Sequence, residues 1–147
     1  MLLGATGSGK TYIACAFGMS AVRQFLPVRY VGLPELITEL AIARTTGTYS
    51  KVIEQYKKPS LPILDELSYI SFNRHQSELL FQVISDRSEK KSTIVTTNLP
   101  FSKWTELFEN DTMVSALVDR LTFHSHILDM NGVSVIRLPL KERHIKQ

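Results

Sequence analysis

Eight residues near the start of the chain have the types and spacing of a phosphate-binding loop. They match G-x-x-x-x-G-K-[ST] at every fixed position, as Gly4, Ala5, Thr6, Gly7, Ser8, Gly9, Lys10 and Thr11. In such a loop the glycines let successive backbone N–H groups turn toward one anion, Lys10 reaches the β- and γ-phosphates of a nucleotide, and the Thr11 hydroxyl can ligate Mg²⁺. The alternative is a glycine-rich turn before an ordinary helix. The strand, loop and helix context decides between the two.

A second stretch places two carboxylates at the end of an apolar run. Residues 61–64 are Leu, Pro, Ile and Leu, and Asp65 and Glu66 follow them. A buried parallel strand delivers acids in this way to the carboxyl edge of an α/β sheet, where ligands bind. By itself the pattern is common. Because it follows a complete phosphate-binding loop, we expect Asp65 to hold the Mg²⁺ shell and Glu66 to orient and deprotonate an attacking water.

A polar amide ends the next β-branched run. Residues 93–97 are Thr, Ile, Val, Thr and Thr, and Asn98 follows, two residues before Pro100. At the tip of a buried strand beside the carboxylates, Asn98 could hydrogen-bond the lytic water or the γ-phosphate. It could equally start the turn before Pro100. Spacing alone leaves both interpretations open.

The remaining pattern alternates predicted helices and strands, which indicates an α/β fold. Apolar residues at helical spacing predict helices over 10–25, 33–44, 74–89 and 113–121, with a shorter amphipathic segment around 52–56 and a short helix after 101–104. Strands are predicted over 28–31, 61–66, 93–97, 124–130 and 133–138. The last two strands would form a C-terminal hairpin through the turn Asn131-Gly132.

Composition indicates one globular domain over residues 1–147. Hydrophobic residues make up 44% of the chain and charged residues 21%, and the net charge of +3 permits a nucleic-acid partner without establishing one. An apolar run of about 18 residues is missing, so no membrane helix is predicted. The single cysteine, Cys15, has no disulfide partner, and we therefore expect a cytoplasmic setting.

The order of these parts resembles the AAA+ family, and within it the IstB/DnaC branch of ATP-binding helpers of insertion-sequence transposition and related helicase loaders. The segments that carry the closer resemblance are 4–14, 30–36, 63–67, 97–104 and 117–121. The most particular are T-N-L-P-F-x-x-W, which begins at Thr97, and D-R-L, which begins at Asp119. The resemblance implies a three-layer P-loop NTPase with a mostly parallel five-stranded sheet in the order 5-1-4-3-2, and it implies ATP and Mg²⁺ as cofactors.

The same resemblance implies roles for three further residues. Asn98 would be the sensor-1 residue. Arg120 would be an arginine finger supplied to the ATP of a neighbouring subunit, which would make hydrolysis depend on a homo-oligomer. A salt bridge to a nearby acid such as Asp119 is the alternative. Arg137 lies near the sensor-2 arginine. It follows Ser-Val-Ile where Ser-Tyr is usual, and one residue reverses the face of a strand.

Two other departures from the branch concern the sheet. Pro62 replaces an aliphatic residue in a strand expected to be central, which is tolerable if Pro62 is the first residue of that strand. Only three residues precede Gly4. We therefore expect a truncated first strand and the loss of the N-terminal partner-binding region of this branch.

The function that the resemblance implies is an ATPase that switches an oligomer on DNA and assists a transposase. A replicative helicase loader shares every catalytic residue, and a remnant that binds ATP without turnover is the non-enzymatic alternative. A P-loop kinase would need an arginine-bearing lid, and a GTPase would need N-K-x-D; neither is seen in the sequence. We expect DNA contact to be independent of base sequence and salt-sensitive, through the segment that carries Arg44, Lys51, Lys57 and Lys58.

Overall fold

The computed structural model describes residues 1–67, 71–88, 90–108 and 111–132. The strands are β1 (Leu2–Leu3), β2 (Val28–Gly32), β3 (Leu61–Leu67), β4 (Ile94–Thr97) and β5 (Leu128–Asp129). The helices are α1 (Lys10–Arg23), α2 (Leu33–Thr45), α3 (Tyr49–Lys57), α4 (Arg74–Arg87) and α5 (Asp111–Thr122), and a 3-10 helix, η1, spans Phe101–Glu106.

The five strands form one sheet in the order β2-β3-β4-β1-β5, and every pairing in it is parallel. This is the predicted order 5-1-4-3-2 counted from the other edge. Parallel neighbours need crossover connections, which α1 to α5 and η1 supply. All strands therefore end at the same edge of the sheet, where the loop after β1 meets the ends of β3 and β4.

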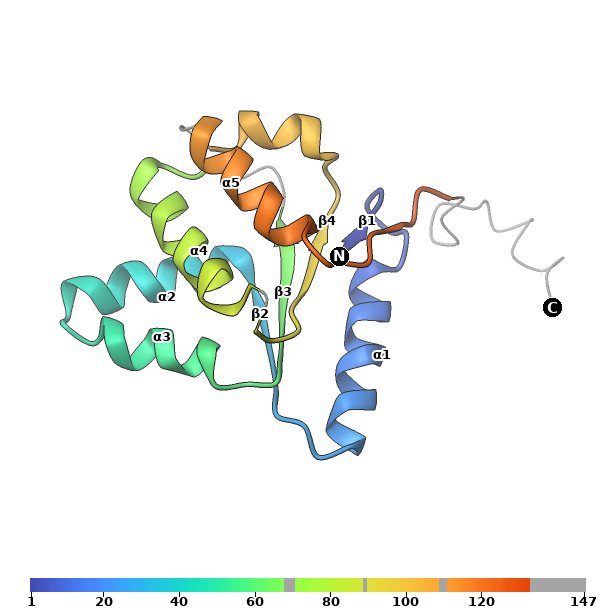
Figure 1. The fold of residues 1–147 in the computed structure, drawn as a ribbon, viewed down its shortest axis with the longest axis horizontal. Helices are drawn as coiled ribbons and strands as arrows, with labels where there is room; N and C mark the ends of the chain where they lie inside the picture. The colour runs from blue at the N-terminus through green and yellow to red at the C-terminus, as the bar shows by residue number, and fades with distance from the viewer. Residues whose placement is uncertain (68–70, 89, 109–110, 133–147) are drawn as a thin grey trace, which may run out of the picture.

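Helices cover the two faces of the sheet unequally. Figure 1 shows α1 alone on one face and α2 to α5 on the other, where most of the buried apolar side chains gather into one core. Helix α1 contacts the sheet through its small residues Ala14, Gly18 and Ala21. A Cβ atom at Gly18 would lie 2.9 Å from Ile63 Cδ1, so glycine lets this helix lie close to β3. The start of α1 is thereby fixed against the strand ends.

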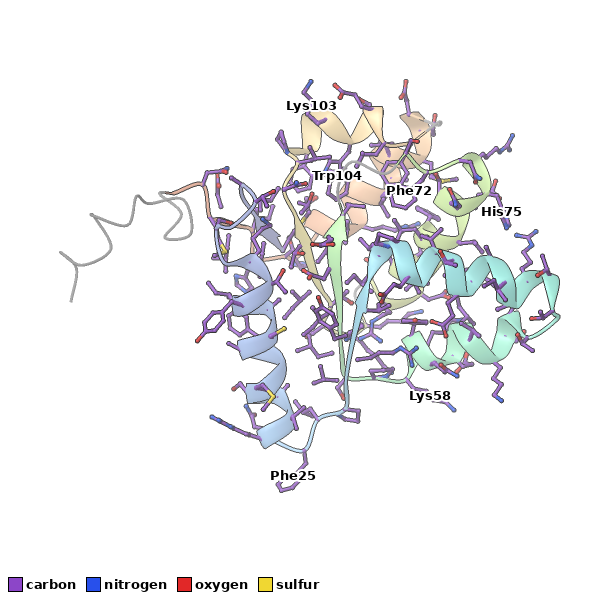
Figure 2. The ribbon with its side chains drawn as sticks, turned by 180° about the vertical axis from the view of Figure 1, so that it is seen from behind. Phe25, Lys58, Phe72, His75, Lys103 and Trp104 are labelled. Carbon is purple, nitrogen blue, oxygen red and sulfur yellow. The ribbon has the colours of Figure 1, made fainter. Side chains whose placement is uncertain are left out.

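Several predicted boundaries are corrected. Helix α1 ends at Arg23, because Phe25 has a φ of 59° and begins the turn to β2; Figure 2 shows the Phe25 ring pointing away from the molecule. The strand predicted over 124–130 is reduced to Leu128–Asp129. His124 is left-handed at φ 50°, and Ser125 N–H donates to Thr122 O, so the chain is still turning there. The strand predicted over 133–138 lies outside the described residues.

Pro62 is the second residue of β3, where the prediction allowed only the first. It pairs with Arg29 of β2, and pairing with β4 begins one residue later, at Ile63. The missing N–H of Pro62 thus falls where β3 has a single neighbouring strand, which limits its cost to the sheet.

Buried Arg87 joins the turns that lead into β3 and β4. Its side chain is 2% exposed and donates six hydrogen bonds. The acceptors are Thr93 Oγ1 at 3.1 Å and the carbonyl oxygens of Tyr56 (3.1 Å), Lys57 (3.0 Å), Pro59 (3.0 Å), Ser60 (3.3 Å) and Ser92 (2.8 Å). One guanidinium therefore fixes the end of α3 and the starts of two central strands.

No helix in the described ranges is long and apolar enough to cross a membrane.

Candidate functional site

The predicted phosphate-binding loop leaves β1 and runs directly into α1. Gly7 and Gly9 have φ values of 80° and 91°, in the left-handed region that glycine adopts without strain. Gly9 is the N-cap residue of α1, and no side chain caps the helix. The N–H groups of the first turn therefore face the loop with the positive end of the helix dipole, which is the arrangement that holds an anion. The strand, loop and helix context required by the sequence motif is confirmed.

Neighbouring strand ends hold the loop in place. Gly4 N–H donates to Thr97 O at the end of β4 (3.2 Å), and Ala5 N–H donates to Asn131 Oδ1 just after β5 (3.1 Å). The sequence had assigned Asn131 only to a turn. Its amide instead supports the loop, a role that no local pattern signals because the contact spans 126 residues.

The Lys10 ammonium bonds to the first two residues of the loop. Its Nζ donates to Gly4 O at 2.6 Å and to Ala5 O at 2.9 Å. Burial lowers the pKa of Lys10, and the negative charges of Asp65 and Glu66 act against that shift. The cation is thus held beside the loop N–H groups, where it adds to their attraction for phosphate.

Asp65 is buried at the end of β3, 2% exposed, and is surrounded by hydroxyl donors. Thr11 Oγ1 lies 3.1 Å from Oδ1 and 3.0 Å from Oδ2, Tyr30 donates to Oδ2 at 2.5 Å, and Thr96 donates to Oδ1. Thr11 and Asp65 therefore face each other as a pair of oxygen ligands, the type that Mg²⁺ prefers. This geometry fits the predicted metal site. The sequence did not identify Tyr30 or Thr96 as part of it.

Glu66 projects from an irregular point in β3. The register with β4 shifts between Leu64 and Leu67, and Glu66 has a φ of 65°. Its N–H donates to Thr96 Oγ1 at 3.0 Å, and the residue is exposed while both neighbours are buried. The bulge turns Glu66 out of the sheet and into a pocket that it lines with Gly7, Lys10, Thr11, Thr96 and Asn98, called the phosphate pocket below.

Asn98 shares that pocket, immediately after β4. Its Oδ1 atom is buried and has no hydrogen-bond partner within the described part of the chain, and the same is true of Ser8 Oγ in the loop. Buried polar atoms are almost always paired in folded proteins. Two unpaired ones beside the phosphate pocket fit a site that binds a polar ligand.

Among the described residues, the predicted arginine finger Arg120 does not line the phosphate pocket. Arg120, on α5, lines a different hollow with Met1 and Thr93, near the starts of β1 and β4 rather than their ends. Its guanidinium lies 5.1 Å from the Phe81 ring, and among the described residues it forms no ion pair with Asp119. Arg137 lies outside the described residues. The roles of both arginines stay predictions.

The predicted DNA-contacting residues differ in what they already bind. Lys57 Nζ lies 2.8 Å from Asp86 Oδ2, and the hydrogen bond to Asp86 raises the pKa of Lys57. Arg44, Lys51 and Lys58 are all exposed, and Arg44 Nη1 lies 3.1 Å from His75 Nδ1.

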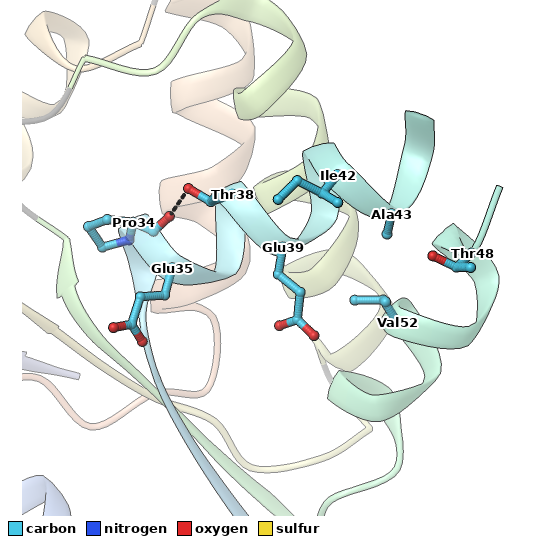
Figure 3. A pocket seen from close by; sticks show the side chains of 8 residues that line it. All are labelled: Pro34, Glu35, Thr38, Glu39, Ile42, Ala43, Thr48 and Val52. Atoms are coloured by element: carbon cyan, nitrogen blue, oxygen red, sulfur yellow. Dashed lines mark hydrogen bonds between the residues drawn. The ribbon is translucent and has the colours of Figure 1, made fainter. Parts of the chain in front are cut away.

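Another hollow runs along α2 and α3 and is open to solvent, with Glu35 and Glu39 pointing to one side of it (Figure 3). Its carboxylates make it unsuited to phosphate. The exposed lysines lie outside that hollow.

The sequence of this chain matches a known protein family. The family of IstB-like ATP binding proteins matches residues 1–143. A relative from Pseudomonas aeruginosa, named as an ATP-binding protein of insertion sequence IS21, is 36% identical over 134 residues, which are 91% of this chain and 51% of the relative. Another, from Geobacillus stearothermophilus and named for insertion sequence IS5376, is 31% identical over 147 residues, 100% of this chain and 57% of the relative. The chain spans about half the length of these relatives.

Solved structures agree on the fold. The DnaC helicase loader superposes with a TM-score of 0.75 at 21% identity, over 87% of this chain and 75% of that one. AMPPCP-bound DnaA from Aquifex aeolicus superposes with a TM-score of 0.73 at 19% identity, over 87% of this chain and 38% of that one. With the family match over residues 1–143, relatives above 30% identity and a parallel P-loop sheet, the chain belongs to the family of IstB-like ATP binding proteins.

Proposed function

We propose that residues 1–147 form one ATP-binding domain that hydrolyses ATP with Mg²⁺. The observation that carries this proposal is the convergence of the uncapped α1 terminus, Lys10, Glu66 and Asn98 on one pocket, beside the paired oxygens of Thr11 and Asp65. Each group suits a different part of a nucleoside triphosphate with its bound metal.

The residues divide the chemistry among them. The N–H groups at the start of α1 and the Lys10 ammonium bind the phosphates, and Thr11 and Asp65 hold Mg²⁺. Mg²⁺, when bound, supplies positive charge that offsets the charge developing on the phosphate oxygens. Glu66 accepts the proton of the attacking water, and Asn98 orients that water through its unpaired Oδ1 atom. Arg120 acts on the nucleotide of a neighbouring copy in a homo-oligomer, and Arg137 completes the site as sensor 2.

We further propose that hydrolysis switches an assembly on DNA and assists a transposase. The support is the set of relatives named for insertion sequences, together with a net charge of +3 and the exposed lysines Lys51 and Lys58. Binding to DNA would depend on phosphate contacts and weaken with salt. The alternative function, a helicase loader, is supported only by the likeness of fold to solved structures. The other alternative, a remnant that binds ATP without hydrolysing it, is distinguished from an ATPase by measuring ATP hydrolysis.

The test is nucleotide binding by Lys10→Ala. Removing the ammonium deletes charge-assisted contacts to phosphate, and the affinity for a fluorescent ATP analogue should fall about tenfold to a hundredfold. Lys103→Ala is the matched control, because Lys103 pairs with Glu106 on the surface of η1. Equal binding by Lys10→Ala and the parent chain would contradict the nucleotide site. Binding without ATP hydrolysis in the parent, with and without DNA, would identify the remnant.

A further inference from the structure

Tyr30 reaches from the edge strand β2 to the carboxylate at the end of β3. Tyr30 pairs with Ile63 across the two strands, and Asp65, two residues further along β3, pairs with Gly32. Residues two apart on a strand lie on the same face, and a long aromatic side chain can span to the diagonal neighbour. The Tyr30 hydroxyl does so and lies 2.5 Å from Asp65 Oδ2.

The three hydroxyls around Asp65 come from three different elements and have different positions. Thr96 of β4 donates to Oδ1, Tyr30 of β2 donates to Oδ2, and Thr11 of α1 lies within 3.1 Å of both oxygens. Thr96 and Tyr30 therefore hold the carboxylate from its two sides. Thr11, which faces both oxygens, shares with Asp65 the position where a metal would bind. Without Tyr30, the described contacts leave Oδ2 bonded to Thr11 alone.

Packing does not account for Tyr30. The residue is 50% exposed and does not belong to either cluster of buried apolar side chains. A phenol is protonated over the physiological range, so the Tyr30 hydroxyl donates to Asp65 Oδ2. The ring of Tyr30 is half exposed while its hydroxyl contacts a buried carboxylate. The position of Tyr30 is therefore explained by its contact with Asp65 rather than by packing.

We propose that Tyr30 is a positioning residue for the Mg²⁺ ligand Asp65: its hydroxyl fixes the orientation of the carboxylate and so strengthens metal-dependent nucleotide binding. The proposal rests on the nucleotide site proposed above. Groups that orient metal ligands commonly contribute tenfold or more to metal affinity.

The experiment measures the affinity of Tyr30→Phe for a fluorescent ATP analogue, once with Mg²⁺ and once with EDTA. A Mg²⁺ titration then gives the Mg²⁺ concentration at which the Mg²⁺-dependent binding is half-maximal. Because the ring is kept and only the hydroxyl is removed, we expect the affinity with Mg²⁺ to fall about tenfold and the affinity in EDTA to stay unchanged. Tyr49→Phe is the matched control, since Tyr49 lies on α3, away from the phosphate pocket. In an Asp65→Asn background, Tyr30→Phe should have no further effect.

The outcomes separate this inference from the proposed function. If the parent chain binds the analogue equally well with Mg²⁺ and EDTA, the metal site itself is wrong and both proposals fall. If the parent depends on Mg²⁺ and Tyr30→Phe keeps the same half-saturation, only the role of Tyr30 is overturned. It is also overturned if Tyr30→Phe weakens binding equally with Mg²⁺ and EDTA, or if it still weakens Mg²⁺-dependent binding when Asp65 is Asn.

Discussion

Replacing Arg87 by Met should be among the most destabilising single changes in this chain. The methionine keeps much of the apolar stem and removes every donor, so five carbonyl oxygens and the Thr93 hydroxyl lose a partner. Lys57 O still accepts from Lys91 Nζ at 2.8 Å, and the deletion also removes a buried charge. Both effects reduce the loss of free energy of unfolding.

The magnitude follows from this balance. An unpaired buried polar group costs about 1–3 kcal/mol, and breaking a buried charged network commonly costs about 3–5 kcal/mol. We therefore expect Arg87→Met to lower the free energy of unfolding by about 3–5 kcal/mol. Arg87→Lys keeps the charge but loses the planar fork that spans both turns, and it should cost about 2 kcal/mol.

The assay is urea unfolding followed by fluorescence of Trp104. Trp104 is the single tryptophan of the chain and is 0% exposed, so its emission reports loss of the core. Arg74→Met is the matched control on the same helix; the Arg74 side chain is 75% exposed, and its surface ion pair with Glu78 should contribute less than about 1 kcal/mol. If Arg87→Met unfolds at the same urea concentration as Arg74→Met, the six hydrogen bonds do not stabilise the fold as argued.

Three further results are expected. Glu66→Gln should bind ATP like the parent and lose turnover by about a hundredfold or more, measured by phosphate release; undiminished hydrolysis would remove Glu66 as the base. Mixing Arg120→Ala with Lys10→Ala chains should restore part of the ATPase activity, whereas no restoration at any ratio would argue against a shared site. Burial, together with the hydrogen bond to Glu39, raises the pKa of Tyr56 from its ordinary 10.0 to about 12. The unfolded chain therefore loses this proton first, and the free energy of unfolding should fall between pH 10 and pH 12, less steeply in Tyr56→Phe.

The parts of the site that the sequence predicted are those whose chemistry is local. Glycines with a following lysine and threonine determine their own backbone geometry, and carboxylates after an apolar run mark a strand end. The loop and the placement of Asp65, Glu66 and Asn98 beside it therefore follow the prediction, and the strand order is the one that the family resemblance implied.

What the sequence missed depends on pairing between distant strands. Tyr30 reaches Asp65 only because β2 and β3 pair in one particular register, and Thr96 and Asn131 support the site through similar long-range contacts. The length of the final described strand was overestimated because apolar alternation over 124–130 does not show that His124 is left-handed. Periodicity describes which residues face a sheet, and it carries no information about where tertiary pairing stops.

The left-handed backbone of Glu66 means that the most stable residue at this position differs from the one that supplies the carboxylate. A residue with a Cβ atom costs about 1–2 kcal/mol in the left-handed region, and glycine is free of that cost. Position 66 is therefore one at which a gain in folding free energy and the loss of the carboxylate come from the same substitution. Libraries of this chain selected only for heat resistance should drift toward glycine there, and the surviving variants would lack the carboxylate that we propose as the base for ATP hydrolysis.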